Sequence, residues 1–198
     1  PLCSSIRRHT RWCVRSRGLG DVYKRQVLME AWAAGSMQAF EELYARYRGP
    51  LYRYILRQVA DDATANDLYQ GSWEKIIKAR KSYRPQAPFR AWMYRIAHNH
   101  VVDHFRRSRP ESELEPERME SLEEAPDELL TRADRQQRLR EALDSLPDKQ
   151  RDAILLKLDA GLDLQTIADV TGVNRETAKS RLRYAVARLK HLMMETVP

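Results

Sequence analysis

The segment from Leu164 to Met193 constrains the fold of this chain more than any other. It predicts two helices joined by a tight turn, because Gly172 can adopt a positive φ and Asn174 can cap the second helix. A short helix, a turn and a longer basic helix are typical of a helix-turn-helix, which places its second helix in a DNA major groove. On this pattern alone, the alternative is an amphipathic hairpin with a solvated basic face. Apolar residues at helical spacing form one side of each helix: Leu164, Ile167, Ala168 and Val170 in the first, and Ala178, Leu182, Ala185, Leu189 and Met193 in the second.

The rest of the chain also shows helical spacing, and no segment shows the alternation of a strand followed by a hairpin turn. The sequence therefore predicts an all-α fold made of two small helical domains. Changes in composition place the first domain at residues 27–107 and the second at residues 131–198. Residues 108–130 are predicted to be an acidic flexible linker, because they combine three prolines with nine acidic residues and can bury little surface.

Residues 1–26 form a basic head without helical or strand periodicity, and its second half resembles translated adapter sequence. The head holds seven Lys and Arg against one Asp, so the rest of the chain carries only +1 of the formal net charge of +7. The basic balance is therefore no argument for nucleic-acid binding. We expect the head to be non-native or disordered; the alternative is a basic arm that grips DNA. Both cysteines, Cys3 and Cys13, lie in it, which excludes a disulfide framework or a Cys-based zinc site elsewhere.

The sequence does not predict an enzyme. It shows no nucleophile–base arrangement and no glycine-rich phosphate loop, so no catalytic residue and no cofactor are expected. His100 and His104 are four residues apart on one helix face, close to His98, but two imidazoles do not fill a tetrahedral zinc shell, and no metal site is predicted. The chain has no apolar run of membrane-spanning length and no signal peptide, so we expect a cytoplasmic protein without membrane insertion.

The first domain begins with an aromatic-rich segment in which a helix break is expected at Gly49-Pro50. A second helix is predicted over Asp67–Ala79, with Asp67 in its first turn, where a carboxylate suits the helix dipole. The residues expected to face the core are Phe40, Leu43, Tyr44, Tyr47, Leu51, Tyr54, Ile55 and Val59 in the first segment, and Leu68, Trp73, Ile76 and Ile77 in the second helix.

A third helix is predicted over Phe89–Arg107, after a loop over Ser82–Pro88. DNA strand separation needs a basic track for phosphates and groups that catch unstacked bases, and this loop and helix offer both. The alternative is a capped interhelical loop with a surface Asn. The expected buried stripe of the helix is Trp92, Met93, Ile96, Ala97 and Val101, whereas Arg90, Tyr94, Arg95, Asn99 and Arg106 lie on its other sides.

Several sequence blocks occur together in a fixed order: DLYQ, then FRAWMYRIAHN, then LPDKQR, IA and TAKSRL. In this order and spacing, the chain from about Val27 to Met193 resembles an extracytoplasmic-function (ECF) sigma factor of bacterial RNA polymerase, with only conserved regions 2 and 4. The resemblance implies core RNA polymerase (β′ clamp and β flap) and promoter DNA as partners, and an anti-sigma factor as a further candidate. The rival interpretation is a stand-alone helix-turn-helix regulator that acts without the polymerase.

The resemblance also implies three groups of site residues, and the chain departs from the family's pattern at three positions. Gly71 stands where the family usually has Glu, Glu176 where Gly is common, and Tyr184 where a basic residue is frequent. Glu176 is expected either to accept from a cytosine amino group or to stabilise its helix N-terminus. The residues expected to dock on the polymerase are Asp67, Gln70 and Glu74. Those expected to bind the −10 element are Tyr83, Arg84, Gln86, Ala87, Arg90, Arg95, Asn99 and Arg106. Those expected to bind the −35 element are Arg175, Glu176, Thr177, Lys179, Ser180, Arg181, Arg183, Tyr184 and Arg188.

Overall fold

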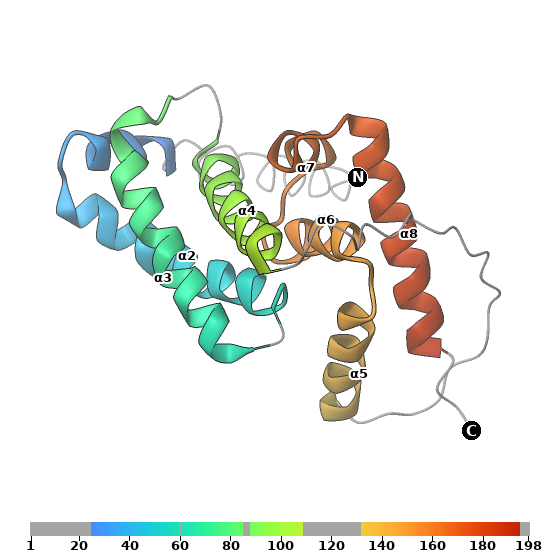
Figure 1. Cartoon of the computed structure of the whole chain (residues 1–198). Coiled ribbons are helices and arrows are strands. Elements are labelled where there is room, and N and C mark those ends of the chain that lie inside the picture. The colour runs from blue at the N-terminus through green and yellow to red at the C-terminus, as the bar shows by residue number, and fades with distance from the viewer. Residues whose placement is uncertain (1–24, 60, 85–87, 109–131, 195–198) are drawn as a thin grey trace, which may run out of the picture.

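A computed structural model describes residues 25–59, 61–84, 88–108 and 132–194. Across these ranges the regular structure is helical throughout, which confirms the predicted all-α class (Figure 1). The head up to residue 24, the linker from residue 109, and Gln86 and Ala87 lie outside the described residues. After a helix over residues 25–33, the elements are α2 (Met37–Leu56), α3 (Asp62–Ala79), η1 (Arg80–Ser82), α4 (Phe89–Ser108), α5 (Arg132–Asp144), α6 (Asp148–Leu158), α7 (Leu164–Thr171) and α8 (Arg175–Met194).

The helix over residues 25–33 includes the last two residues of the predicted head, which was expected to span residues 1–26. Arg25 and Gln26 belong to this helix and bind the first domain. The Arg25 guanidinium donates to the Tyr47 hydroxyl at 3.4 Å, and the Tyr83 hydroxyl donates to Oε1 of Gln26 at 2.7 Å. The folded part of the chain therefore starts at or before Arg25.

Helix α2 does not break at Gly49-Pro50, contrary to the expectation from sequence. It starts at the Ser36 cap, whose hydroxyl accepts from the amide of Ala39, and runs through Pro50 to Leu56. Proline removes one hydrogen bond from a helix interior. The helix nevertheless continues through Pro50, because side chains before and after it are buried in the same core: Leu43, Tyr47, Leu51, Tyr54 and Ile55. Tertiary packing therefore overrides the local signal.

Helix α3 begins five residues earlier than predicted, so the expectation that Asp67 lies in its first turn is wrong. The Asp61 carboxylate caps the helix by accepting from the amides of Ala63 and Thr64, at 3.3 and 2.7 Å. Hydrogen bonds from the hydroxyl and amide of Thr64, and then from Ala63, lower the pKa of Asp61. Asp67 lies in the second turn, beyond the part of the helix where the dipole acts most strongly.

Two residues of the first domain face the opposite way from the prediction. Ile77 is 37% exposed, because its neighbour Ile76 takes the inward position and adjacent residues differ by 100° around a helix. Tyr94 is fully buried, because α4 is covered on two sides, by α2 and α3 and by α7 of the second domain. Its ring packs edge-on against Tyr54, with centroids 5.4 Å apart.

The second domain follows the predicted order of helices, with α6 at its centre (Figure 1). The Asp163 carboxylate caps α7 by accepting from the amide of Thr166, and Gly172 closes it with a φ of +67°. The side chain of Asn174 then accepts from the amide of Thr177 at 2.7 Å and caps α8. These local contacts form the helix-turn-helix as the sequence predicts.

The two domains pack directly against each other, which nothing in the sequence indicates. Helix α4 lies against α7, and α6 lies between the first domain and α8, as Figure 1 shows. Five consecutive residues of α6, from Asp152 to Leu156, are buried, so no side of this helix segment faces solvent. A continuous hydrophobic cluster therefore joins the two domains.

Candidate nucleic-acid interface

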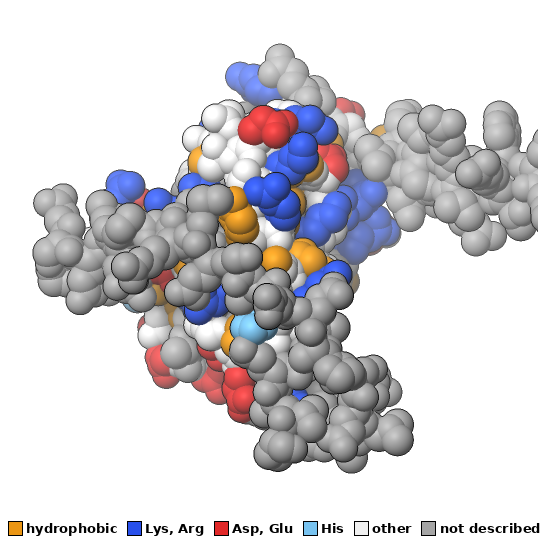
Figure 2. All heavy atoms as spheres, turned by 90° about the vertical axis from the view of Figure 1, so that its right-hand side faces the viewer, with side chains coloured by type: hydrophobic (Ala, Val, Ile, Leu, Met, Phe, Trp, Pro, Cys, Tyr) orange, Lys and Arg blue, Asp and Glu red, His pale blue; other side chains and the backbone are white. Residues whose placement is uncertain are grey.

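Helix α8 carries the residues expected to bind the −35 element. It extends from the helix-turn-helix along one side of the molecule, and Figure 2, which views that side, shows Lys and Arg side chains gathered on it. The side chains in the buried seam are those of Ala178 and Ala185, which lie seven residues apart. Of the expected residues, Arg175, Glu176, Lys179 and Arg183 are exposed, and Thr177, Ser180, Arg181, Tyr184 and Arg188 are half-buried.

Contacts within α8 explain part of its departure from the family pattern. Glu176 lies in the first turn, 3.6 Å from Nζ of Lys179 and 4.0 Å from a guanidinium nitrogen of Arg175. Both pairs are exposed, so each contributes little to stability. Arg183 lies over the Tyr184 ring at 4.8 Å and donates to its hydroxyl at 2.9 Å. Tyr184 thus orients a neighbouring cation instead of supplying one.

Helix α4 presents an exposed stripe that includes three residues expected to bind the −10 element. Arg95, Asn99 and Arg106 are exposed and follow one another at helical spacing. Val102 lies between Asn99 and Arg106 and is 36% exposed. Sequence reasoning missed Val102 because an apolar residue in a helix is normally assigned to the core. The stripe combines two cations with an amide and an apolar contact, a set that suits phosphates and unstacked bases.

Tyr83 and Arg90, also expected to bind the −10 element, are engaged within the protein. Tyr83 is buried, binds Gln26 and packs edge-on against Trp92 with centroids 5.3 Å apart, and its burial raises the pKa of its hydroxyl. Its ring is therefore not available for base stacking in this conformation. Arg90 donates to the carbonyl of Gly161 in the second domain at 2.9 Å. Arg84 is exposed.

The residues expected to dock on the polymerase lie together on the outer side of α3. Asp67, Gln70 and Glu74 are all exposed and follow helical spacing, so they form one polar face. Glu74 also lies 3.6 Å from Nζ of Lys78, in an exposed ion pair. The face is acidic, which suits a basic partner surface.

Gly71 lies beside that face, and the structure gives a reason for its lack of a side chain. A Cβ added at Gly71 would stand 2.5 Å from Cε1 of His100, closer than real contacts allow. The His100 ring packs here between α3 and α4, with Nδ1 at 3.3 Å from the Ser72 hydroxyl. Burial and then the nearby Lys75 and Arg107 cations lower the pKa of His100. The missing charge at position 71 is therefore linked to close helix packing.

The three histidines of α4 do not converge. His100 binds Ser72, whereas Nδ1 of His98 lies 3.0 Å from the Asp152 carboxylate of the second domain. In the described part of the chain, no group of three or more His, Cys, Asp or Glu side chains could hold a metal ion. The described helices also include none that combines the length and the apolar character needed to cross a bilayer.

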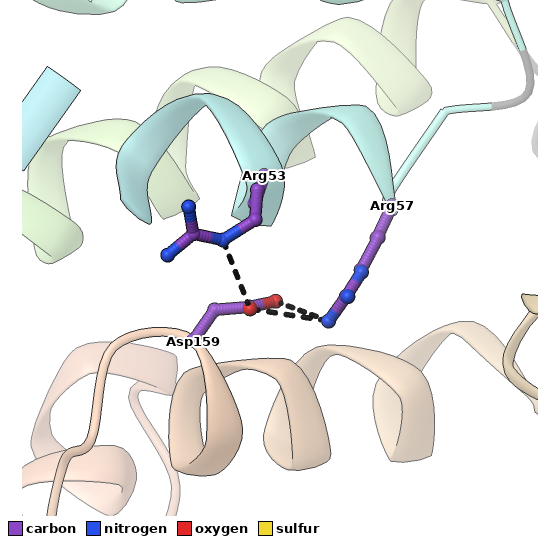
Figure 3. A network of polar contacts seen from close by, with 3 residues as sticks. All are labelled: Arg53, Arg57 and Asp159. Carbon is purple, nitrogen blue, oxygen red and sulfur yellow. Dashed lines mark hydrogen bonds and ion pairs between the residues drawn. The ribbon is translucent and has the colours of Figure 1, made fainter. Parts of the chain in front are cut away.

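Asp152 of α6 and Asp159, the C-cap residue directly after α6, form polar contacts between the domains that sequence reasoning missed. Asp152 accepts from the Tyr54 hydroxyl and from Nε2 of Gln58, both at 2.7 Å. Asp159 accepts from the Arg57 guanidinium at 3.0 and 3.1 Å, and Nε of Arg53 lies 3.8 Å away (Figure 3). The available signal was their spacing, because residues seven apart lie on one side of a helix.

The contacts around Asp152 and those around Asp159 differ in how far they offset the cost of removing the polar groups from water. Burial raises the pKa of the Tyr54 hydroxyl well above its usual range, and the nearby Asp152 carboxylate adds to the effect, so the hydroxyl is a donor to Asp152 at physiological pH. Burial also raises the pKa of Asp159, which Arg57 and Arg53 offset only in part. The Asp159 carboxylate is thus held between the domains at a desolvation cost.

Comparison with known proteins gives matches along most of the chain. Two family models match: Sigma-70 region 2 over residues 43–111, and Sigma-70, region 4 over residues 136–189. The ECF RNA polymerase sigma factor BldN of Streptomyces coelicolor is 30% identical over 177 residues, which cover 87% of this chain and 67% of BldN. The RNA polymerase sigma-H factor of Pseudomonas aeruginosa is 30% identical over 169 residues, which cover 79% of this chain and 87% of that protein.

Two solved structures share the fold. CnrH, in complex with the cytosolic domain of CnrY, is 23% identical with a TM-score of 0.66, over 88% of this chain and 99% of that chain. The sigma factor RpoE of Bartonella quintana, in complex with the anti-sigma factor NepR, is 23% identical with a TM-score of 0.64, over 81% of this chain and 100% of that chain. At this identity, the similarity bears on the fold alone.

Proposed function

Because this chain belongs to the ECF sigma factors of bacterial RNA polymerase, we propose that it directs promoter-specific initiation through three surfaces: the face of α3, the exposed stripe of α4 and helix α8. The observation that carries this proposal is that one chain presents two helices with exposed basic side chains, α4 and α8, on separate domains. A stand-alone helix-turn-helix regulator needs only the second domain. The match of the first domain to region 2 therefore argues against that rival.

The α4 stripe is the proposed −10 surface. Arg95 and Arg106 would bind backbone phosphates, and Asn99 between them would hydrogen-bond the edge of an unstacked base. Val102 supplies an apolar contact beside Asn99. Because these groups lie on one rigid helix, little ordering is needed when DNA binds.

Helix α8 is the proposed −35 surface. It is the second helix of the helix-turn-helix, the element that enters the major groove in such motifs. Arg175, Lys179 and Arg183 are exposed and would divide between phosphates and base edges. Glu176 is proposed to stabilise the helix N-terminus, because it lies in the first turn and already contacts two cations.

The face of α3 formed by Asp67, Gln70 and Glu74 is the proposed docking site for the β′ clamp. Its acidic character suits a basic partner surface and would steer association. We also propose an anti-sigma factor as a partner, by analogy with RpoE, whose structure was solved with the anti-sigma factor NepR. The proposed activity places the protein in the cytoplasm, where the polymerase works.

Promoter binding with and without core enzyme tests the proposed function. DNA fragments are selected from a randomised promoter pool by the chain together with core RNA polymerase. Binding of the selected duplex by the chain, with and without core enzyme, is then measured by gel shift. We expect tight, sequence-selective binding only when both proteins are present. Equal selective binding by the chain alone would support the stand-alone regulator instead.

A further inference from the structure

One cation on the exposed side of α8 differs from the others in its partner. Arg175 and Lys179 both lie within 4.0 Å of the Glu176 carboxylate, so part of their charge is balanced within the helix itself. Among the described residues, Arg183 pairs with no carboxylate, and its contacts are with the uncharged side chain of Tyr184. Arg183 therefore keeps its full charge for a partner outside the chain.

Two contacts with Tyr184 fix the direction of the Arg183 guanidinium. Its central carbon lies 4.8 Å from the centroid of the tyrosine ring, and Nη2 donates to the tyrosine hydroxyl at 2.9 Å. The first contact is an attraction between a cation and the face of a ring, and the second is directional. A long side chain with several rotatable bonds is thereby ordered before DNA binds.

The position of Arg183 on α8 suits contact with DNA better than the positions of two other arginines. Arg183 follows the buried Ala178 by five positions, or about 140° around the helix, so it lies away from the buried seam. Arg181 and Arg188 each follow a buried alanine by three positions and lie beside that seam, where both are half-buried. In the described part of the chain, Nε of Arg181 is even buried without a hydrogen bond.

We propose that Arg183 recognises a guanine of the −35 element and that Tyr184 is the positioning residue that orients its guanidinium for this contact. Guanine presents O6 and N7 as acceptors in the major groove, and a planar guanidinium can donate to both at once. One N–H group is used by Tyr184, and the others stay available for the base. This inference rests on the proposed function, which places α8 in the major groove.

The arrangement suits a base edge better than a phosphate. A phosphate is bound by a cation from many directions, and such a contact carries no sequence information. A bidentate contact with a base depends on the direction of the guanidinium plane, which Tyr184 fixes. The tyrosine at position 184, where the family frequently has a basic residue, therefore contributes to base preference through its neighbour.

Modified −35 duplexes test this inference. The full chain and core RNA polymerase first select a preferred −35 sequence from a randomised pool. Each guanine of that sequence is then replaced, one at a time, by adenine or by 7-deazaguanine, which lacks the N7 acceptor, and binding is measured by gel shift. For the parent chain, we expect adenine to weaken binding at one guanine by at least about tenfold. We expect a smaller loss with 7-deazaguanine, which keeps O6.

Two substitutions distinguish the recognising residue from the positioning residue. Arg183→Gln should abolish the preference for this guanine over adenine and leave the preferences at other positions unchanged. Tyr184→Phe keeps the ring and removes the hydroxyl, so the same preference should fall about three- to tenfold, because the guanidinium is no longer ordered before binding. Tyr52→Phe, which changes a half-buried tyrosine of α2, is the matched control and should behave like the parent. Urea unfolding should show that all the variants are folded.

The inference is wrong if Arg183→Gln weakens binding to every duplex equally and lowers the salt dependence, because Arg183 would then be a phosphate contact. It is also wrong if Tyr184→Phe leaves the guanine preference at the parent value, or weakens binding at every position alike. A parent chain that selects a −35 sequence without a sensitive guanine contradicts this inference alone. A parent chain that selects no sequence together with core enzyme contradicts the proposed function as well.

Discussion

Gly71 of α3 and His100 of α4 occupy one tight contact, in which a Cβ on Gly71 would stand 2.5 Å from Cε1 of the imidazole. The ring is held in place by the Ser72 hydroxyl, 3.3 Å from Nδ1, so it cannot move away without losing that contact. A glycine in a helix interior costs about 1 kcal/mol relative to alanine. The close packing of α3 on α4 offsets this cost.

Gly71→Ala should therefore destabilise the first domain although alanine favours helix. We expect a loss of about 1–2 kcal/mol in the free energy of urea unfolding, because the added methyl overpacks the contact. In a His100→Ala background, the same change should instead stabilise by up to about 1 kcal/mol. Equal effects of Gly71→Ala in the two backgrounds would show that the two residues do not interact.

The lowered pKa of His100 predicts a pH dependence of stability. In the unfolded chain His100 has the ordinary histidine pKa of about 6.5, whereas its pKa in the folded chain is lower. At a pH between these two pKa values, the unfolded chain therefore binds more protons than the folded chain. The stability from His100 is complete above about pH 6.5 and is lost as the pH falls through the folded pKa. Thermal unfolding between pH 5 and 8 should show this decline, and His100→Gln should reduce the slope. An unchanged slope in the variant would contradict the assignment, since the other histidines are common to both proteins.

Asn99→Ala should impair promoter opening more than initial binding, because an unstacked base is available only after the strands part. Permanganate footprinting should show a loss of reactivity on duplex promoters of at least about tenfold, and a smaller loss on pre-melted ones, where separation is already paid for. Asn66→Ala, an exposed amide on α3, is the control and should have no effect. Equal defects on both templates would count against base capture.

Glu176→Gly should leave the preferred −35 sequence unchanged, because the carboxylate is proposed to act on its own helix. Loss of the first-turn charge and the added glycine should lower the stability of the second domain by about 1 kcal/mol. A selection from a randomised −35 pool measures the preference, and urea unfolding measures the stability. A change of preferred base at one position would show that Glu176 reads DNA.

Much of the fold follows from local sequence signals. Asn174 caps α8 and Gly172 ends α7 as predicted, because capping depends on residues only a few positions apart. Pro50 gives a wrong local signal for the opposite reason: the elements that pack against the continuous α2 helix, α3 and α4, are distant in sequence. Local patterns carry no information about such neighbours.

The candidate sites, like the fold, were predictable from sequence only where local helical spacing determines them. The exposed positions of Arg95, Asn99 and Arg106 follow from helical spacing alone. The burial of Tyr94 and the pairing of Asp152 with Tyr54 do not, because both result from one domain packing on the other. An interface between two domains that are distant in sequence leaves no periodic pattern in the sequence.

Start-site-specific run-off transcription tests the central claim most directly. Purified core RNA polymerase, the full chain and a promoter selected as above are combined with nucleotides, and the RNA is sized. We predict a single run-off product that requires both the chain and the −10 and −35 elements, and that falls at least about tenfold with Arg95→Ala and Arg106→Ala together. A product that forms equally without the chain, or with both elements scrambled, would contradict its function as a sigma factor.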